Sequence, residues 1–277
     1  MKVGIVAKFH AEGIGNFLER LKKIAERNDL QLVGEKGINE LFPMTQEEYE
    51  RREVPLHCDV MMVLGGDGTL LSIADVAAKS STPIIGVNLG YLGFLTEVKP
   101  EEMEEVLIQF LEGKAVIEER DMLEVFFDGK RDLVLNDAVI NKGALARIIR
   151  IKVKIDGLDV TIVRADGIIV STATGSTGYS LSAGGPIVTP GVSAIVITPI
   201  CPHTLTMRPI VISSSSSVEL ELLTSGEDVY LTLDGQRGKA LNKGDSVFIK
   251  LSEKKLKLVR PYYRNYFEML REKLKWG

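Results

Sequence analysis

Residues 60–87 read VMMVLGGDGTLLSIADVAAKSSTPIIGV, and this stretch decides the fold. The apolar run 60–64 predicts a buried strand, the apolar residues between 70 and 77 recur at helical spacing, and 83–87 predicts a second strand. A strand, a helix and a strand in this order predict a β-α-β unit and therefore a parallel sheet. Such sheets bind ligands beyond the carboxyl ends of their strands, which is where residues 65–69 and 88–93 fall.

The first of these loops is Gly65-Gly66-Asp67-Gly68-Thr69. Glycine amides at the start of a helix form an anion site, and phosphate is its usual occupant. We therefore expect the donor phosphates of a transfer reaction at Gly65, Gly66, Gly68 and Thr69. An acid inside such a loop repels phosphate unless it binds a metal ion or accepts a proton from an attacking hydroxyl, so Asp67 predicts phosphoryl transfer with Asp67 as the catalytic base.

The composition excludes several classes of protein. The 277 residues carry 34 basic and 38 acidic side chains without a long block of one charge, so nucleic acid is not expected as a partner. No window reaches the roughly 18 apolar residues that a membrane span needs. The two cysteines, Cys58 and Cys201, are far apart and predict neither a disulfide framework nor a zinc site. We expect a cytoplasmic protein with no membrane partner.

The two halves of the chain differ in their predicted secondary structure. The first half alternates strand and helix patterns, beginning with a strand at 3–7 and a helix through 17–25, while 35–55 is charged and irregular and predicts a loop. After a charged helix at 100–113, short β-rich segments separated by turns dominate. A last helix is expected at 265–276, packed on one of the domains.

A second loop rich in glycine and hydroxyl side chains spans residues 166–186 and follows an apolar strand pattern. Clusters of this composition are often plain turns, but here we favour a ligand site, with Gly175 and Gly178 allowing close approach of the backbone to a pyrophosphate. The hydroxyls that could donate hydrogen bonds to that pyrophosphate belong to Thr174, Ser176, Thr177, Tyr179, Ser180 and Ser182.

Three further positions stay open between two interpretations. Asn136-Asp137 interrupts an apolar strand pattern, and its carboxylate either serves a ligand or lies in water on the exposed side of a pleat. Arg147 and Arg164 suit a phosphate or carboxylate partner, although single arginines are commonly solvated surface residues.

Taken together, these motifs resemble the NAD kinase family. Gly65–Thr69 alone also resembles diacylglycerol, sphingosine and 6-phosphofructo kinases, but the combination in this order over residues 60–240 is specific. The motifs that carry the resemblance are Gly65-Gly66-Asp67-Gly68-Thr69, Asn88-Leu89-Gly90 followed by Gly93-Phe94-Leu95-Thr96, Asn136-Asp137, Thr174-Gly175-Ser176-Thr177 with Tyr179-Ser180-Leu181-Ser182, Pro199-Ile200-Cys201-Pro202-His203, and Leu233-Asp234-Gly235-Gln236.

The resemblance implies a fold and an activity. The fold is α/β, with an N-terminal Rossmann-like α/β domain at 1–98, against which a C-terminal helix at 265–277 could pack, and a β-rich NAD-binding domain at 99–264. The activity is transfer of the γ-phosphoryl group of ATP, with a divalent metal cation (Mg or Mn), to the 2′-hydroxyl of the adenosine ribose of NAD. Homodimers or homotetramers are implied as well.

The resemblance also implies roles for residues of this sequence. Asp67 takes the hydroxyl proton beside Gly68, Asn136 and Asp137 hold ribose hydroxyls, and Asp166 recognises the nicotinamide end. The remaining residues implied to contact NAD are Arg147, Arg164, Thr174, Thr177, Gly178, Tyr179, Ser180, Leu181, Ser182 and Gln236. The metal ligands are not implied by any motif.

The sequence departs from the family pattern at three of these motifs. Glutamate is more usual than Asp137, proline than Ala173 and alanine than Gly178. None of these changes removes a chemical group that the reaction requires. Two alternatives remain: a lipid kinase of the diacylglycerol or sphingosine type, which would need access to a bilayer, and a non-catalytic NAD(P) sensor, which has no use for a carboxylate aimed at phosphate.

Overall fold

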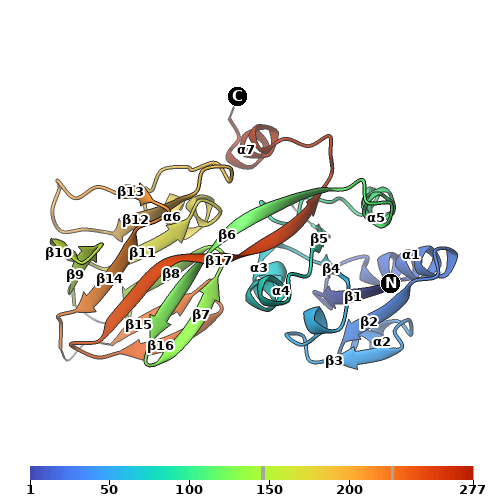
Figure 1. Cartoon of the computed structure of the whole chain (residues 1–277), viewed down its shortest axis with the longest axis horizontal. Coiled ribbons are helices and arrows are strands. Elements are labelled where there is room, and N and C mark those ends of the chain that lie inside the picture. Colours follow the sequence, from blue (N-terminus) through green and yellow to red (C-terminus); the bar gives the residue numbers. More distant parts are fainter. Residues whose placement is uncertain (91, 145–146, 226–227, 277) are drawn as a thin grey trace. The chain divides into compact units, whose positions relative to one another are not determined.

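The computed structural model describes residues 1–90, 92–144, 147–225 and 228–276, and the chain divides into two compact units (Figure 1). Unit 1 comprises Met1–Glu119 and Leu256–Gly277, and unit 2 comprises Arg120–Lys255. The sequence interpretation placed these boundaries at 98 and 264. They differ because helix α5 (Met103–Leu111) and the last residues of strand β17 (Ser246–Arg260) contribute Met103, Val106 and Val259 to the core of unit 1.

Unit 1 is built on a parallel sheet, as predicted, and its central strands β1, β4 and β5 are apolar and almost fully buried, as is typical of strands covered on both faces. The strand order is β17-β5-β4-β1-β2-β3, and every pairing between these neighbours is parallel. The strands that belong wholly to this unit are β1 (Lys2–Ala7), β2 (Gln31–Glu35), β3 (Glu47–Tyr49), β4 (Val60–Leu64) and β5 (Ile84–Val87).

Helices of unit 1 pack against this parallel sheet. Helix α1 (Ile14–Arg27) buries one apolar stripe in the same core as α5, and the three-residue helix η1 (Val54–Leu56) packs against β1 and against α4 (Ala74–Ser80). The last helix, α7 (Tyr266–Leu274), belongs to unit 1 and begins at Asn265, whose side chain accepts a hydrogen bond from the Glu268 amide at 2.9 Å.

Two local expectations for unit 1 were wrong. The single helix predicted through 70–77 is two short helices, α3 (Asp67–Leu71) and α4, because the backbone leaves the helical path at Ile73. Segment 35–55, predicted as a loop, contains α2 (Ile38–Leu41), β3 and η1. These elements are too short to show a hydrophobic period in the sequence.

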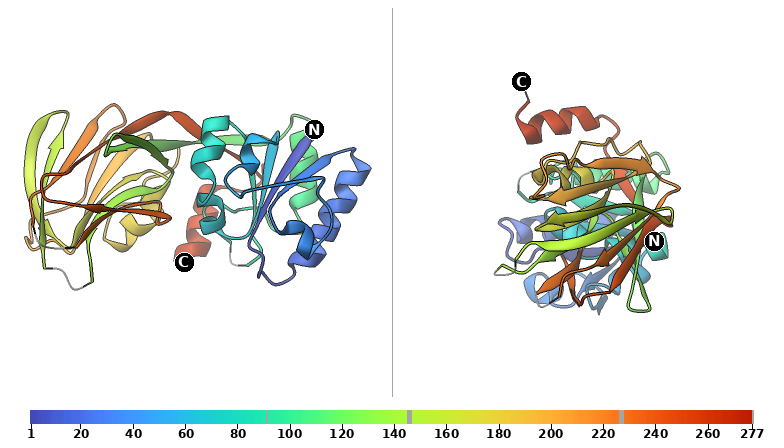
Figure 2. Two further views of the ribbon diagram at one scale, coloured as in Figure 1. Left: turned by 90° about the horizontal axis from the view of Figure 1, so that it is seen from below. Right: turned by 90° about the vertical axis from the view of Figure 1, so that its left-hand side faces the viewer.

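Unit 2 consists of a six-stranded antiparallel sheet and the antiparallel part of the eleven-stranded sheet, in agreement with the β-rich prediction (Figure 2). One sheet has the order β13-β12-β11-β8-β15-β16, and the other contains β10-β9-β14-β17 together with the β6–β7 hairpin. The strands are β6 (Val116–Phe127), β7 (Lys130–Val134), β8 (Asp137–Lys142), β9 (Ile149–Ile155), β10 (Leu158–Ala165), β11 (Gly167–Thr172), β12 (Ala194–Ile200), β13 (Ile210–Ser213), β14 (Ser217–Leu222), β15 (Val229–Leu233), β16 (Arg237–Leu241) and the first part of β17.

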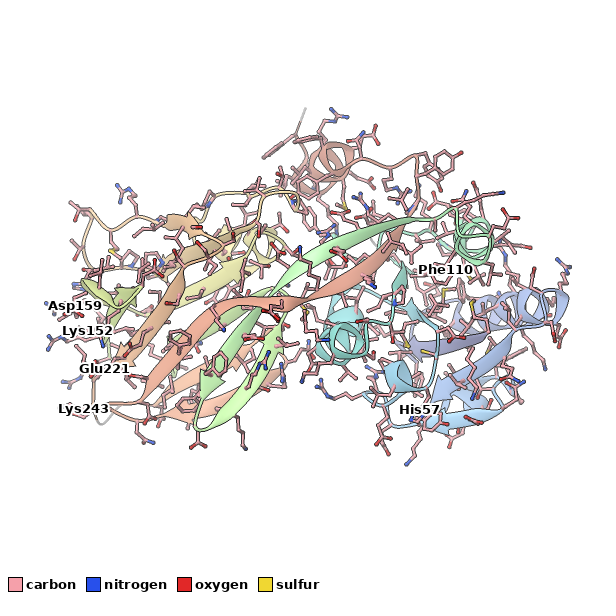
Figure 3. The ribbon with its side chains drawn as sticks, in the orientation of Figure 1. His57, Phe110, Lys152, Asp159, Glu221 and Lys243 are labelled. Carbon is pink, nitrogen blue, oxygen red and sulfur yellow. The ribbon has the colours of Figure 1, made fainter. Side chains whose placement is uncertain are left out.

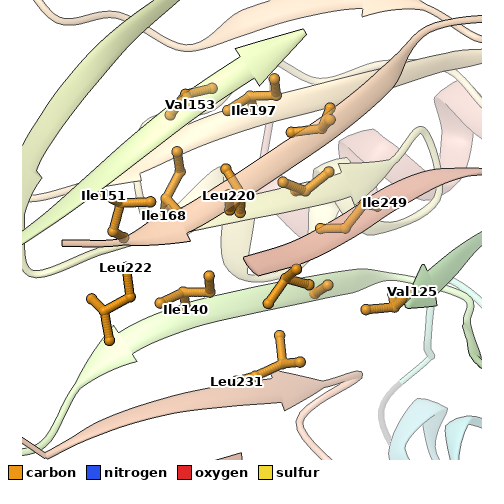
Figure 4. Packing of buried hydrophobic residues seen from close by; sticks show 14 of the residues in the cluster. Val125, Ile140, Ile151, Val153, Ile168, Ile197, Leu220, Leu222, Leu231 and Ile249 are labelled. Carbon is orange, nitrogen blue, oxygen red and sulfur yellow. The ribbon is translucent and has the colours of Figure 1, made fainter. Parts of the chain in front are cut away.

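The core of unit 2 lies between these sheets (Figure 4). Alternate residues of β14 point inward, so Val218, Leu220 and Leu222 are buried while the glutamates between them are not. They meet Ile140 of β8 and Ile168 of β11 from the other sheet. At roughly 1.5–3 kcal/mol for each fully buried side chain, this packing is the main stabilising term of the unit.

The apolar strand pattern that Asn136-Asp137 interrupts is two strands, β7 and β8, separated by Leu135-Asn136. Strands β13 and β16 were not predicted, because both alternate exposed and half-buried residues at a sheet edge. A 3₁₀ turn, η2 (Gly175–Thr177), and a short helix, α6 (Tyr179–Ser182), follow β11. Among the described residues, no helix is long and apolar enough to cross a membrane.

Candidate active site

The loop between β4 and α3 lies at the carboxyl end of the parallel sheet, as predicted. Gly66 precedes α3, Asp67 is its first residue, and a Cβ atom on Gly65 would lie 2.6 Å from the Thr69 hydroxyl oxygen. Nothing lies within 4 Å of the Cβ positions of Gly66 or Gly68. The loop therefore folds back on Thr69 and leaves the backbone at Gly66 and Gly68 open to a ligand.

The carboxylate of Asp67 is half-exposed and is held by the turn formed by residues 93–96. Its Oδ2 atom accepts a hydrogen bond from the Phe94 amide at 2.8 Å. Its Oδ1 atom accepts three, from the Leu95 amide at 3.1 Å, the Thr96 amide at 3.0 Å and the Thr96 hydroxyl at 2.9 Å. A carboxylate offers about four lone pairs, so these contacts occupy Oδ1 fully and leave one lone pair on Oδ2.

Gly93 makes this arrangement possible. A Cβ atom on Gly93 would lie 2.0 Å from Oδ1 of Asp67 and 2.5 Å from the Thr96 hydroxyl oxygen. Any larger residue would therefore displace the carboxylate. Residues 93–96 belong to the family motifs, although the sequence alone predicts no role for them.

A cavity of about 420 Å³ opens beside this loop, within unit 1. Lys8, at the end of β1, is exposed and makes no ion pair with a described residue. It stands beside the glycine loop, since a Cβ atom on Gly65 would be 3.3 Å from the Lys8 Cβ. The lining residues are Lys8, His10, Ala11, Glu12, Gly65, Gly66, Asn88, Leu89 and Gly90. An ammonium group and open amides in one cavity are suited to phosphate.

The sequence reasoning missed Lys8. Its position directly after an apolar strand of a parallel sheet was the available signal, because the strand ends of β1 and β4 are neighbours in such a sheet. In contrast, the helix expected to supply a dipole is short, since α3 has only five residues. The positive charge at this cavity therefore comes from Lys8 more than from a helix end.

In unit 2, three motifs that lie far apart in the sequence come together. The Thr172 hydroxyl donates to the Leu135 carbonyl at 2.6 Å, and a Cβ atom on Gly175 would lie 2.0 Å from the Asn136 carbonyl oxygen. The Asp234 carboxylate accepts hydrogen bonds from the amides of residues 135, 136 and 137 at 2.8, 2.7 and 3.1 Å. Segments 135–137, 172–178 and 234–236 thus form one structure.

This structure encloses a cavity of about 300 Å³. Both members of the Asn136-Asp137 pair line it, which resolves the open interpretation: Asp137 is buried, with 6% of its surface exposed, and does not lie in water on a pleat. The other lining residues are Val139, Asn141, Tyr179, Thr232, Asp234 and Gly235. Asn141, Thr232 and Asp234 were not predicted, although Asp234 lies in a quoted motif.

The two buried carboxyl groups of this cavity differ in their surroundings. Burial first, and then repulsion by Asp234, raises the pKa of Asp137 to about 7. Burial also raises the pKa of Asp234 to about 6, but three backbone amides and Arg237 oppose that rise. Because Asp234 has hydrogen bonds that stabilise its charge, Asp137 is the member of the pair that holds a proton near neutral pH.

The hydroxyl loop that follows β11 uses part of its hydroxyls for its own fold. The Ser176 hydroxyl donates to the Ala173 carbonyl at 2.6 Å, and the Ser180 hydroxyl lies 2.8 Å from that of Thr198. Thr174 is buried and receives a hydrogen bond from Arg120 at 3.5 Å. Among the residues of this loop predicted to contact NAD, those that are half-buried or exposed are Thr177, Gly178, Tyr179, Leu181 and Ser182.

The remaining predicted contacts lie elsewhere in unit 2. Gln236 is exposed in the turn before β16. Asp166 pairs with Lys142 at 3.5 Å, at the opposite end of β8 from Asp137, about 17 Å away at 3.4 Å per residue. Arg147 and Arg164 are exposed. The structure therefore brings Asn136, Asp137 and Tyr179 together and separates them from Asp166.

Two profiles of known protein domains match this chain, one in its N-terminal part and one in its C-terminal part. The profile of the ATP-NAD kinase N-terminal domain matches residues 3–115, and that of the ATP-NAD kinase C-terminal domain matches residues 135–261. The chain belongs to the NAD kinase family. Members of this family are phosphotransferases, which agrees with the kinase motifs in the sequence.

Individual NAD kinases are similar over most of the chain. The NAD kinase of Geobacter sulfurreducens is 53% identical over 230 residues, 81% of each protein, and that of Geobacter metallireducens is 45% identical over 290 residues, covering 100% of this chain and 99% of the relative. The crystal structure of an NAD kinase from Archaeoglobus fulgidus in complex with ATP matches with a TM-score of 0.81 and 26% identity, covering 98% of this chain and 99% of that one.

Proposed function

We propose that this chain transfers the γ-phosphoryl group of ATP to the 2′-hydroxyl of the adenosine ribose of NAD and so forms NADP. The observation that carries the proposal is the Asp67 carboxylate, oriented by four hydrogen bonds next to an open glycine loop. The family membership supplies the acceptor, since the relatives are named NAD kinase.

The donor phosphates are proposed to lie in the 420 Å³ cavity of unit 1. There the amides around Gly66 and Gly68 contact phosphate oxygens, and the Lys8 ammonium neutralises part of their charge. Thr69 supports the loop through its contact with Gly65. The Archaeoglobus enzyme was crystallised in complex with ATP, which is consistent with a nucleoside triphosphate donor here.

Asp67 is proposed to act as the general base through Oδ2, which accepts the hydrogen bond from Phe94 and keeps a second lone pair for the proton. The ribose oxygen attacks the γ-phosphorus as its proton passes to Oδ2, the bond from that phosphorus to the bridging oxygen breaks, and ADP leaves. Because little covalent chemistry is required of the protein in such transfers, positioning of the hydroxyl and the base contributes most of what this chain supplies.

The ribose of NAD is proposed to bind in the 300 Å³ cavity of unit 2. A neutral Asp137 can donate one hydrogen bond and accept others, so it suits two adjacent hydroxyls, and the Asn136 amide offers both kinds of partner. Tyr179 can cover an aromatic or sugar ring. The predicted contacts that complete the NAD site remain Arg147, Arg164, Asp166, Thr174, Thr177, Gly178, Ser180, Leu181, Ser182 and Gln236.

A divalent metal cation, Mg or Mn, is proposed to accompany the donor. Among the described residues no three His, Cys, Asp or Glu side chains gather where they could hold a metal ion together. This fits an ion that is bound mainly by substrate phosphates and keeps several waters, as Mg²⁺ usually is. When bound, such an ion neutralises charge on the transferring group.

We further propose that the protein is a cytoplasmic homodimer or homotetramer. The edge strand β10 exposes three apolar side chains, Leu158, Val160 and Ile162, with 73%, 45% and 46% of their surfaces exposed, and an exposed apolar sheet edge favours pairing between copies. Free Cys58 and Cys201 suit a reducing compartment. Light scattering after gel filtration gives the mass directly.

The two alternative functions receive no support. The relatives that match most of the chain are named NAD kinase, which describes neither a lipid kinase nor a sensor without catalysis. Incubation of the purified protein with Mg-ATP and either NAD or diacylglycerol, with NADP detected by an NADP-specific dehydrogenase, tests all three. NADP formation supports the proposal, whereas binding of NAD without NADP formation under any donor or metal would overturn it.

A further inference from the structure

A short series of buried and partly buried hydrogen bonds leads from the wall of the donor cavity to Asp67. The Gly90 amide donates to Oδ1 of Asn88 at 2.7 Å, Nδ2 of Asn88 donates to the Thr96 hydroxyl at 3.0 Å, and that hydroxyl donates to Oδ1 of Asp67 at 2.9 Å. Asn88 is 5% exposed and Thr96 is fully buried. All four residues lie in unit 1.

The donor and acceptor of each hydrogen bond in this series are fixed by the groups at its two ends. An amide N–H can only donate, so Oδ1 of Asn88 must face Gly90, and its Nδ2 must then face Thr96. A carboxylate can only accept, so the proton of the Thr96 hydroxyl must point at Asp67. The hydroxyl of Thr96 therefore has one possible orientation while Asp67 is ionised.

The Asp67 carboxylate also accepts a hydrogen bond from the Thr96 amide, so Thr96 supplies two of the four donors that contact this carboxylate. Both bind Oδ1, and so leave Oδ2 with the single contact from Phe94. The geometry points to Thr96 as a positioning residue, which with Asn88 behind it fixes Oδ1 and directs the free lone pair of Oδ2 at the acceptor hydroxyl. This inference rests on the proposed function, and it adds a residue that no motif marked as functional.

The turn that carries Thr96 is itself held firmly. Glu97, the next residue, is buried and pairs with Arg260, whose Nη2 lies 2.8 Å from the Glu97 carboxylate. Arg264 donates to the Glu97 carbonyl and pairs with Glu102 at 2.9 Å. A turn fixed in this way cannot follow the Asp67 carboxylate if the carboxylate rotates, which is what a positioning element requires.

Steady-state kinetics of Thr96→Val and Thr96→Ser test the assignment. Valine keeps the shape and removes the hydroxyl, so we expect kcat to fall about 10- to 100-fold, since small displacements of reacting groups cost up to about 10²-fold. The KM values for NAD and ATP should change by less than about threefold. Serine keeps the hydroxyl and should restore kcat to within about threefold of the wild type.

Thr82→Val is the matched control. Thr82 is also buried, donates to the Pro55 carbonyl at 2.8 Å and contacts the Ser80 hydroxyl at 2.7 Å, but it does not touch Asp67. It should lose a similar amount of thermal stability and keep its kcat. Turnover of Thr96→Val within twofold of the wild type, or an equal loss in Thr82→Val or in Thr96→Ser, would overturn the inference.

A crystal structure of Thr96→Val separates this inference from the proposed function. If the wild type forms no NADP, the proposed function fails on its own, but the position of the carboxylate can still be read. We expect Asp67 to have rotated away from the 93–96 turn in the variant. An unmoved carboxylate would refute the positioning role whether or not the wild type is active.

Discussion

Replacing Asp137 with asparagine should make the protein more stable at alkaline pH. The pKa of Asp137 is about 7 in the folded protein and the ordinary value is 3.8. The folded state therefore binds more protons than the unfolded state between about pH 4 and pH 7, and the free energy of unfolding falls as the pH rises through that window. Asparagine does not titrate, so the free energy of unfolding of the Asp137→Asn variant does not fall through this window for that reason.

The size of the effect follows from the pKa difference. Each unit corresponds to 1.36 kcal/mol, so a rise from 3.8 to about 7 corresponds to about 4 kcal/mol at full development. The Asn variant should gain on the wild type by about 1.4 kcal/mol per pH unit from pH 4 to 7, and the difference should then level off. At about 2–4 °C per kcal/mol, the Tm of unit 2 should differ by about 10 °C at pH 8.

Thermal unfolding at half-unit pH steps from 4.5 to 9 measures this difference. Asp159→Asn is the control, because Asp159 is exposed and pairs with Lys152 at 2.9 Å on the surface of the same unit (Figure 3). Its Tm difference from the wild type should stay small at every pH, since exposed pairs contribute little. A constant or shrinking advantage of Asp137→Asn as the pH rises would refute the account of this cavity.

The remaining predictions concern unit 1. Lys8→Ala should raise the KM for the donor about 10- to 100-fold, the loss of one charged hydrogen bond, and leave the KM for NAD unchanged; Lys23→Ala on α1 is the control, and equal donor KM values in both variants would contradict the role of Lys8. Gly93→Ala should lower kcat at least 10²-fold with little change in Tm, because its Cβ displaces the carboxylate of Asp67; a crystal structure with Asp67 unmoved would contradict it.

Much of the fold could be predicted because its strongest signals are local. The apolar strand 60–64, the glycine loop after it and the strand 84–87 made a parallel sheet the only simple arrangement, and β4 and β5 pair in parallel. What could not be predicted was where short elements begin. The apolar residues at helical spacing continue across the break after α3 and do not mark it, and β13 and β16 are edge strands whose residues are mostly exposed or half-buried.

The candidate site shows the same limit more sharply. Asp67 could be proposed from the sequence because glycines flank it, whereas Asn136-Asp137 stayed open as a pattern and gained a proposed role only from the family resemblance. Thr96 lies in a family motif, but the sequence gives it no role, and nothing local marks Lys8, since a lysine after a strand is common. Their roles depend on which loops meet at the carboxyl edge of the sheet, and only the folded structure shows that.

The central claim is that the Asp67 carboxylate removes the proton of the acceptor hydroxyl. The most direct test is the turnover of Asp67→Asn with NAD and Mg-ATP, measured together with NAD binding by calorimetry. The account predicts that kcat falls by about 10² to 10⁴, the usual contribution of a general base, while the Kd for NAD stays within about threefold of the wild type. Near-normal turnover in a variant that still binds NAD would contradict it.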